Sequence, residues 1–439
     1  MSEQQDSKHL LKISLQGLQR LGQTAVVAAR TGLRYQQEGG RQANRPRLLR
    51  EAFEQLGATY LKLGQFMASS PSLFPREYVE EFQYCLDRTP PLPYAQIEAQ
   101  LQAAFDRPLS EIFASIDPVP LASASIAQVH PARLVTGEDV VIKVQKPGIE
   151  AMLRTDLGVV YGSLRLMETL MPQIKFAALS EIMDEIRSRM VREVDFVEEA
   201  ANIADFQQFL KVTGNTQVVA PRVYPQASTR TVLTMERFYG VPLTDVEVMK
   251  RYAKDPAQVL IQTMNTWFAS LMLCRSFHAD LHAGNVLLLQ DGRIGFIDFG
   301  IVGQLKPEVW SACIAFMDAL QKMDYTAMAS HMVRMGMTHG QIDQARLAQD
   351  MEKLFGVMMT ADPQAMLGGD IAELNDLMLD MVAIGERHGI HFPRDFALLM
   401  KQMLYFDRFM RVLTPNMDLF ADARVQLLNE PEPLSRLIH

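Results

Sequence analysis

Cysteine and long apolar runs are scarce in this chain of 439 residues, which contains only three cysteines. Cys85, Cys274 and Cys313 lie far apart and form no Cys-x-x-Cys pair, which excludes a disulfide framework and a zinc knuckle and is typical of a reducing compartment. The longest uncharged, apolar-rich run, 259–274, is interrupted by amide and hydroxyl side chains and is too short to span a bilayer. We therefore expect no transmembrane segment and a cytoplasmic protein, with any membrane contact peripheral, at the inner membrane.

Several common enzyme signatures are absent as well. The chain has no GxxxxGK[ST], GxGxxG, HExxH or GxSxG motif. A Walker-type ATPase, a Rossmann dehydrogenase, a zincin and a serine hydrolase thus lose their usual support. The formal net charge of −8 argues against nucleic acid as a partner, because nucleic-acid binding depends on Lys and Arg.

The charge is unevenly distributed along the chain. Residues 1–50 carry nine Lys or Arg against three acidic residues, a net +6, which leaves −14 for the remainder. Leucines at helical spacing within 8–36, with basic residues between them, predict an amphipathic helix. Such a helix could lie on a membrane surface. We favour the alternative, a helix packed on the protein's own core.

Short β-branched segments between longer helical ones indicate the fold class. A hairpin is predicted over 125–145, with its turn at Thr136-Gly137, and two more strands over 218–224 and 229–238. Helices are predicted over 48–70, 94–105, 149–211 and 244–277, and a Met-rich, mostly helical region follows residue 306. We expect these methionines to form core in preference to a lipid pocket. The order of elements predicts an α+β fold, not a doubly wound sheet.

Residues 277–300, FHADLHAGNVLLLQDGRIGFIDFG, concentrate the polar chemistry. The run from His278 through Asp280 to Asn285 fits the kinase catalytic loop H-R-D-L-x-x-x-N with Ala in place of Arg, and DFG follows at Asp298. A hairpin between Asn285 and Asp298 would bring the two side by side. In phosphoryl transfer Asp280 would orient or deprotonate the attacking hydroxyl, while Asn285 and Asp298 would hold Mg²⁺. The alternative, a metal-assisted hydrolase built on the two histidines His278 and His282, lacks a further motif to complete its site.

The nucleotide-binding parts of a kinase are expected upstream, in order. Val140-Val141-Ile142-Lys143 corresponds to V-A-I-K, whose Lys pairs with the α- and β-phosphates. ASASIAQV (122–129) corresponds to G-x-G-x-x-G-x-V. Its members are Ala122, Ala124 and Ala127 at the glycine positions, Val129, and the hydroxyls Ser123 and Ser125. Because alanine does not adopt positive φ cheaply, this loop should sit differently over the phosphates than a glycine loop.

Two further segments complete the kinase pattern, and one part is missing. TVLTMERF (231–238) is predicted as the hinge strand, with Met235 beside the adenine and backbone groups offered by Glu236 to Phe238. EVDFVEEA (193–200) has three carboxylates at helical spacing, for which a solvated acidic face is the alternative. No A-P-E follows DFG at the usual distance, since Lys-Pro-Glu at 306–308 comes too early. We expect no platform for a peptide substrate.

The chain resembles the UbiB/AarF family of atypical, protein-kinase-like (ADCK-type) proteins over about residues 50–415. Gly57-x-x-x-x-Lys62-Leu63-Gly64-Gln65 is similar to the family's KxGQ helix, and ASASIAQVH, EVDFVEEA, HADLHAGN and DFG follow in the family's order. The resemblance implies a two-lobe kinase-like fold with a small antiparallel N-lobe sheet, extra N-terminal KxGQ helices and a mostly helical C-lobe. The expected division is a basic extension (1–50), the KxGQ segment (51–120), the N-lobe with inserted helices (121–238) and the C-lobe (239–439).

The resemblance also implies roles and chemistry. Lys62 and Gln65 would lie across the mouth of the nucleotide site, Glu193 and Asp195 would be the ExD pair that meets the KxGQ helix, and Glu199 would pair with Lys143. The implied cofactors are ATP and Mg²⁺, and the implied activity is ATP hydrolysis or small-molecule phosphorylation that supports ubiquinone biosynthesis at a membrane. A lipid or prenyl-quinone precursor and quinone-biosynthesis proteins are the implied partners. Protein phosphorylation is disfavoured because the KxGQ helix would occlude the cleft.

The chain departs from the family pattern in three places. ASSPSLFP stands where STRPDLLP is usual, so Ser70 and Ser72 replace a charged pair and the KxGQ segment could be anchored differently. HAGN replaces HPGN, and the C-terminal spans of some members are not seen. A nucleotide-binding scaffold or lipid chaperone with negligible catalysis stays open, although the intact Lys143, Asp280, Asn285 and Asp298 argue against it.

Overall fold

The structure is a computed structural model of the chain. It describes all residues except 1, 41–42, 69–73, 86–88, 171–186, 188–189, 191–193, 244–251, 253–254, 275, 283, 339–340, 362–370, 393 and 414–439. Two compact units are present, and each is described by itself. Unit 1 comprises Met1–Ala68, Phe74–Glu198 and Tyr224–Met235, and unit 2 comprises Ser69–Leu73, Glu199–Val223 and Glu236–His439.

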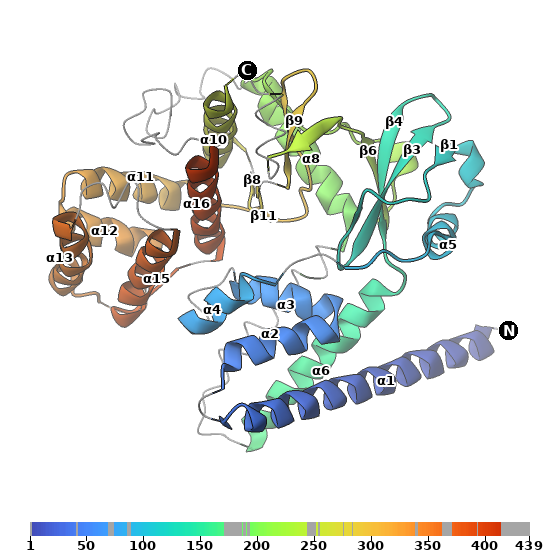
Figure 1. Cartoon of the computed structure of the whole chain (residues 1–439), viewed down its shortest axis with the longest axis horizontal. Coiled ribbons are helices and arrows are strands. Elements are labelled where there is room, and N and C mark those ends of the chain that lie inside the picture. Colours follow the sequence, from blue (N-terminus) through green and yellow to red (C-terminus); the bar gives the residue numbers. More distant parts are fainter. Residues whose placement is uncertain are drawn as a thin grey trace. The chain divides into compact units, whose positions relative to one another are not determined.

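Unit 1 is built around an antiparallel sheet in the order β1-β3-β4-β6, with β2 beside β3 (Figure 1). The strands are β1 (Phe113–Ile116), β2 (Ala122–Ser123), β3 (Ala127–Leu134), β4 (Asp139–Gln145) and β6 (Val232–Glu236). The predicted hairpin is confirmed as β3–β4, and Gly137 in its turn has a φ of 102° that favours glycine. Ile142 and Val144 of β4 pack with Ile97 and Leu101 of α5 (Tyr94–Ala104) in the core.

The helices of unit 1 begin and end where the sequence supplies caps and breaks. They are α1 (Ser2–Gln37), α2 (Arg45–Leu56), α3 (Ala58–Ala68), α4 (Arg76–Phe82) and α6 (Ile149–Leu170). Asn44 caps α2 by accepting a hydrogen bond from the Arg47 N–H. The single helix predicted over 48–70 is wrong, because Gly57, with a φ of 89°, separates α2 from α3.

The basic N-terminal helix packs within its own unit. Arg20 of α1 donates from Nε and Nη2 to the two carboxylate oxygens of Asp156 on α6, at 2.8 and 2.7 Å. Its Nη2 also donates to the Leu56 carbonyl at 2.6 Å. Asp156 is completely buried. These contacts support the favoured interpretation of α1 as a helix docked on the protein's own core.

Unit 2 contains a second small sheet in the order β5-β10-β9-β7. The strands are β5 (Val218–Val219), β7 (Gly240–Pro242), β9 (Val286–Leu289) and β10 (Ile294–Phe296). The hairpin predicted after Asn285 is confirmed as β9–β10, with Gly292 at a φ of 86° in the turn. Two short pairs are separate: β8 (Phe277–His278) with β11 (Val302–Gly303), and β12 (Met337–Thr338) with β13 (Ile390–His391). The strand predicted at 218 pairs in parallel with β10 and so belongs to this sheet.

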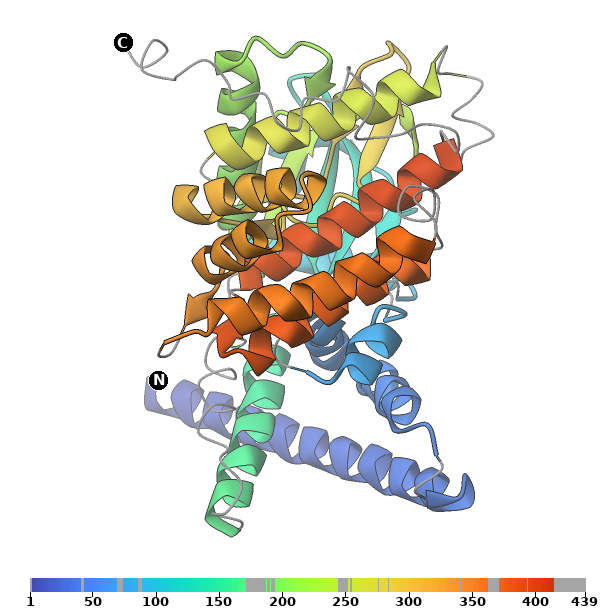
Figure 2. The ribbon, with the colours of Figure 1, turned by 90° about the vertical axis from the view of Figure 1, so that its left-hand side faces the viewer.

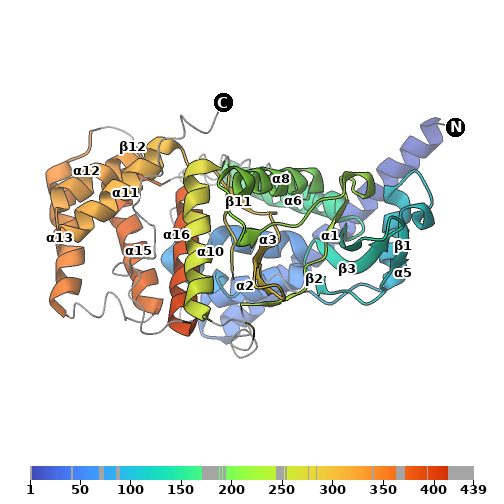
Figure 3. The ribbon, with the colours of Figure 1, turned by 90° about the horizontal axis from the view of Figure 1, so that it is seen from above.

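Helices make up most of the described part of unit 2, and Figure 2 shows several of them. They are α8 (Phe196–Val212), whose first three residues belong to unit 1, and α10 (Pro256–Leu273), α11 (Pro307–Gln321), α12 (Tyr325–Met335), α13 (Gln344–Ala361), α15 (Ile371–Arg387) and α16 (Arg394–Leu413). Helices α10 and α16 lie side by side (Figure 3), and the rings of Trp267 and Phe406 meet at a centroid distance of 5.1 Å. Met328, Met332 and Met351 are buried, so these methionines form core as expected. Within the described residues, none of the helices is both long and apolar enough to cross a membrane.

Candidate active site

His278 begins the catalytic loop at the end of β8 and is completely enclosed. Its Nδ1 accepts a hydrogen bond from the Asp280 N–H at 3.2 Å, and its Nε2 lies 3.2 Å from the Ile297 carbonyl. Burial lowers the pKa of His278, so the ring is neutral at pH 7 and Nε2–H is the donor to Ile297. With both nitrogens engaged, His278 supports the loop from inside and offers no ligand to a metal. The hydrolase alternative loses one of its histidines.

Asn285 closes the catalytic loop onto itself. Its Nδ2 donates to the Asp280 carbonyl at 2.9 Å, and its own carbonyl accepts from the Ile297 N–H at 3.0 Å. The β9–β10 register pairs Val286 with Phe296, so the hairpin holds Asn285 beside the segment that leads into Asp298. The predicted arrangement of loop and hairpin is present.

Asp298 has a backbone conformation that is uncommon for a residue other than glycine. Its φ is 61°, and only one other described non-glycine residue has a positive φ. Such strain is found most often at functional sites, where surrounding contacts impose it. The Gly300 N–H donates to Asp298 Oδ1 at 3.3 Å. A Cβ at Gly300 would lie 3.2 Å from Asp298 Oδ1 and 3.9 Å from Oε2 of Glu199, so both carboxylates border the space that this glycine leaves open.

Helix α8 carries Glu199 and is tied to the DFG segment. Glu199 is buried, and Asn202, one turn later, donates from Nδ2 to the Phe299 carbonyl at 3.1 Å. Phe206, farther along α8, packs its ring against Phe299 at 5.2 Å. The structure thus places Glu199 near Asp298, a proximity that their spacing in the sequence did not reveal. The pairing of Glu199 with Lys143 stays a prediction.

Asp280 is held by a residue that the sequence reasoning missed. Lys401 of α16 donates from Nζ to Asp280 Oδ1 at 2.9 Å, and Nε2 of His282 lies 4.0 Å from Oδ2. Burial by itself raises the pKa of Asp280, but Lys401 and His282 outweigh it, and the pKa lies below its ordinary value. Burial lowers the pKa of Lys401, but the negative charge and hydrogen bond of Asp280, with a contribution from Tyr405, outweigh it and raise that pKa above its ordinary value. No local signal marks Lys401, because 121 residues separate it from Asp280.

In unit 1, the loop predicted to cover the phosphates is a tight turn between β2 and β3. Ala122 is paired with Val129, and the Ala124 N–H donates to the Ala127 carbonyl at 2.9 Å. No residue of 122–129 has a positive φ, so the turn forms without the conformations that a glycine loop uses. Ser123 is half-buried and Ser125 is buried. The alanine positions are compatible with the predicted difference from a glycine loop.

Lys143 lies in β4 at the position opposite Val129. Its side chain is buried, with Nζ 5.5 Å from the centre of the Phe196 ring. A second lysine, Lys146, follows three residues later and donates to Thr89 Oγ1 at 2.6 Å. Thr89 in turn donates to the Ala124 carbonyl at 2.7 Å. A strand lysine near the alanine loop is what phosphate binding requires, and that role stays a prediction.

The predicted hinge contains one of the points at which the chain passes from unit 1 to unit 2, between Met235 and Glu236. Met235 is buried at the end of β6. Glu236 is bound to Arg222 twice: its N–H donates to the Arg222 carbonyl at 2.8 Å, and its Oε2 accepts from the Arg222 N–H at 3.1 Å. Phe238 covers Gly295, where a Cβ would lie 2.8 Å from the ring. Contact of these residues with an adenine stays a prediction.

The KxGQ and ExD residues have separate local duties. Lys62 and Gln65 are half-buried on α3, and their position at a nucleotide site stays a prediction. Glu193 lies outside the described residues. Asp195 precedes α8, accepts from the Val197 N–H at 3.0 Å and pairs with Arg230 Nε at 3.0 Å. The expectation that Asp195 and Glu199 share a helix is therefore wrong, because α8 begins at Phe196.

Asn285 and Asp298 fit a magnesium ion and not a protein-enclosed metal. Both supply oxygen ligands, which Mg²⁺ prefers. Among the described residues there is no group of three or more His, Cys, Asp or Glu that could hold a metal. Mg²⁺ is commonly bound by one or two carboxylates together with substrate phosphates, so a sparse protein ligand set is expected for it.

Comparison with known proteins agrees with this geometry. Residues 84–332 match the ABC1 atypical kinase-like domain. An uncharacterized aarF domain-containing chloroplastic protein kinase of Arabidopsis thaliana is 47% identical over 401 residues, which cover 87% of this chain and 74% of that protein. A probable protein kinase UbiB of Azotobacter vinelandii is 29% identical, over 88% of this chain and 71% of the relative.

A solved structure supports the fold. The complex of a Mycobacterium tuberculosis protein with erythromycin matches with a TM-score of 0.55 at 24% identity, over 80% of this chain and 87% of that one. At this identity the likeness concerns the fold alone. The α+β kinase-like fold expected from the sequence is confirmed. The chain belongs to the ABC1/UbiB (aarF domain) family of atypical kinase-like proteins.

Proposed function

We propose that this protein is an Mg²⁺-dependent ATPase or small-molecule kinase that supports the biosynthesis of ubiquinone or another prenyl-quinone lipid. The observation that carries the proposal is the closed catalytic loop, in which Asn285 binds the Asp280 backbone and the β9–β10 hairpin leads to a strained Asp298. When bound to Asn285 and Asp298, Mg²⁺ would neutralise charge on the phosphate oxygens.

Different residues of the chain are proposed to have different roles in phosphoryl transfer. Asp280, kept ionised by Lys401, would accept the proton of the attacking hydroxyl or orient it. Lys143, on β4, would contact the α- and β-phosphates, and Glu199 would orient that lysine. The lack of an A-P-E segment after DFG favours a small acceptor or water over a protein substrate.

The metal assignment is tested by Asp298→Asn in the purified protein. Calorimetry with ATP or ADP should show binding that requires Mg²⁺ and that weakens at least about tenfold in the variant, because a charged ligand is lost. Asp291→Asn is the matched control, since Asp291 lies at the exposed tip of the same hairpin and pairs only locally with Arg293. Equal nucleotide affinity in wild type and Asp298→Asn would disprove the assignment.

Turnover separates the enzyme from the scaffold alternative. Phosphate release should be stimulated by vesicles containing anionic lipid or by a prenylated phenol. Asp280→Asn should lower that rate by about 10²-fold or more, as loss of a general base does, while nucleotide binding persists. A protein that binds nucleotide but releases no phosphate with any lipid is the scaffold or lipid chaperone.

A further inference from the structure

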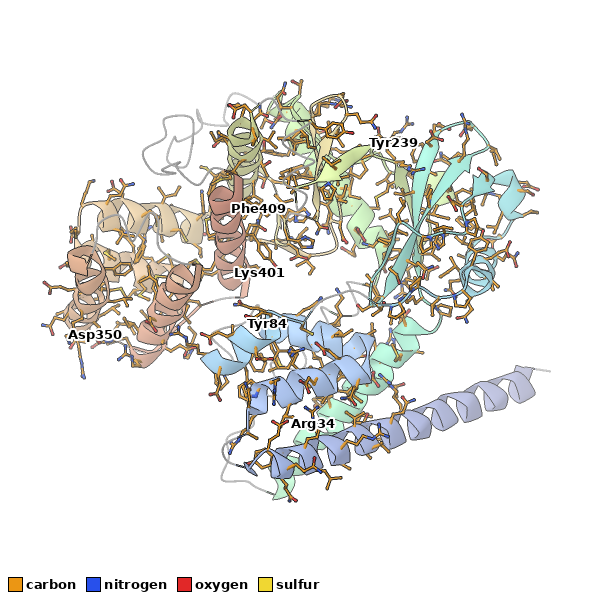
Figure 4. The ribbon with its side chains drawn as sticks, in the orientation of Figure 1. Arg34, Tyr84, Tyr239, Asp350, Lys401 and Phe409 are labelled. Atoms are coloured by element: carbon orange, nitrogen blue, oxygen red, sulfur yellow. The ribbon has the colours of Figure 1, made fainter. Side chains whose placement is uncertain are left out.

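Helix α16 contacts the catalytic loop through several side chains that lie within about one turn of the helix. The buried Gln402 accepts from the Leu281 N–H at 2.8 Å and donates to the Leu281 carbonyl at 3.0 Å. The Tyr405 ring lies 6.2 Å from that of His282, in an edge-to-face arrangement. The loop and α16 therefore form one packed assembly inside unit 2. Figure 4 shows Lys401 and Phe409 on this helix.

The other side of the loop is held through α10, against which α16 packs. Trp267 of α10 donates from Nε1 to the His278 carbonyl at 2.7 Å and packs against Phe406 of α16. The loop backbone is thus fixed at His278, two residues before Asp280, and at Leu281, directly after it. These hydrogen bonds hold the backbone of the loop, but they do not orient the side-chain carboxylate of Asp280.

Lys401 supplies that orientation. The side chains of Lys401 and Asp280 are 25% and 22% exposed, so the pair lies at the border of the interior, where a charge pair is screened less than in open solvent. Nζ also lies 5.4 Å from the centre of the Tyr405 ring, which favours a cation there. Because Nζ binds Oδ1, the carboxylate is held in one orientation and still has lone pairs with which to accept a substrate hydroxyl.

We propose that Lys401 is a positioning residue of the active site, which fixes the Asp280 carboxylate for phosphoryl transfer, and that α16 is a working part of the catalytic apparatus. This inference rests on the proposed function. It extends the apparatus beyond residue 332, where the match to the family domain ends. A misplaced reacting group costs up to about 10²-fold in rate, so fixing one carboxylate is enough to matter.

Lys401→Met and Lys401→Arg test the role. Lys401→Met should lower kcat for phosphate release by roughly 10- to 100-fold while the Kd for Mg-ATP changes less than about twofold, because the residue acts on Asp280 and not on the nucleotide. Lys401→Arg keeps the charge and the donor and should restore most of kcat. Lys353→Met is the matched control, since Lys353 is an exposed lysine of α13 that pairs with Asp350.

In wild type, Lys401→Met would leave the Asp280 carboxylate without its partner and could impair folding. The same change is therefore also made in an Asp280→Asn background, where no carboxylate is left unpaired. There Lys401→Met should change the residual kcat less than about twofold, because positioning acts only through the carboxylate. A second readout is acylation of Lys401 by an N-hydroxysuccinimide ester, followed by mass spectrometry. The Asp280→Asn change should increase the rate of acylation of Lys401 several-fold, because Nζ is no longer bound to a carboxylate, and should leave the rate at Lys353 unchanged.

The outcomes are distinguishable. Normal kcat in Lys401→Met, with an active wild type, overturns the positioning role and leaves the proposed function standing. Equal losses of kcat in the wild-type and Asp280→Asn backgrounds, or a loss that Lys401→Arg does not restore, indicate a purely structural role and also overturn it. A wild type without phosphate release under any condition overturns the proposed function, and with it the role of Lys401.

Discussion

At the scale of single residues, several side chains in the motif segments also have structural duties. His278 supports the loop backbone through both ring nitrogens, and Asp195 begins α8 and binds Arg230. Gly64 of the KxGQ segment is buried where α3 meets α4, and no space exists there for a side chain. A residue of a motif can therefore be required by packing, and its presence in the motif does not by itself assign it a role in catalysis.

Gly64→Ala should destabilise the protein. Its Cβ would lie 2.7 Å from Phe82 Cδ1 and 3.0 Å from Cys85 Sγ, inside a buried cluster that cannot give way easily. The expected cost is about 1–3 kcal/mol of unfolding free energy, as for overpacked cores, measured by urea denaturation.

Gly158→Ala on α6 is the control for that prediction. Nothing lies within 4 Å of the Cβ position there, so alanine should raise stability by up to about 1 kcal/mol through its helix propensity. Similar changes at both glycines would contradict the packing argument for Gly64.

At the scale of elements, α1 and α16 each attach to the rest of a unit through a few polar contacts. Arg20 joins α1 to α6 and to the end of α2, while Lys401 and Gln402 join α16 to the catalytic loop. In each case a long charged or amide side chain of the helix binds a group that is buried or partly buried. Contacts of this kind determine where a helix docks, which hydrophobic periodicity alone leaves open.

Asp156→Asn should weaken the docking of α1. The buried Asp156 binds Arg20 through both oxygens, and its neutralisation leaves the guanidinium without its partner charge. We expect a loss of about 3 kcal/mol, and faster hydrogen exchange across α1. Arg34→Met is the control, because the ion pair of Arg34 with Glu51 is partly exposed and screened by solvent, so its loss should change stability much less. Unchanged exchange in α1 of Asp156→Asn would show that apolar packing alone holds the helix.

At the scale of the whole molecule, the buried side chain of His130 should make the free energy of unfolding depend on pH. His130 of β3 is completely buried, with Nδ1 2.8 Å from the Asp117 carbonyl and Nε2 3.0 Å from the Gln128 amide. Burial lowers the pKa of His130 below its ordinary value, although the Asp117 contact opposes this. Below about pH 6.5 the unfolded chain binds the proton more readily than the folded one. Stability is therefore complete above that pH and falls as the pH drops.

His130→Gln should reduce this acid sensitivity. The difference in Tm between pH 7.5 and pH 5.5 should be smaller in the variant than in wild type, whatever the change in absolute Tm. His391→Gln is the control, since His391 is exposed on β13. An equal Tm difference in wild type and His130→Gln would rule out His130 as the linked group.

The molecule's charge asymmetry is partly neutralised within unit 1. Arg34 and Arg47 both pair with Glu38, and Arg50 pairs with Glu54 and Glu81. Several basic residues of the N-terminal segment thus have acidic partners within the protein. This supports docking of α1 over a free basic surface as the explanation of its charge.

The local elements of the fold can be predicted from the sequence alone. Turn residues and alternating apolar positions predict the β3–β4 and β9–β10 hairpins, and fixed spacing predicts the order of Lys143, Asp280, Asn285 and Asp298 along a kinase-like fold. These features depend on neighbours in the chain, whose geometry the peptide backbone restricts. The roles of these residues in nucleotide binding stay predictions.

Contacts between elements that are distant in the sequence are visible only in the folded structure. It placed β5 beside β10, Glu199 near Asp298, Arg20 on Asp156 and Lys401 on Asp280. Asp280 and Lys401 lie 121 residues apart, and their pairing depends on how α10 and α16 pack around the loop. No local pattern records such a contact, because a helix with one lysine more or less has the same periodicity, and only burial beside a carboxylate gives that lysine its role.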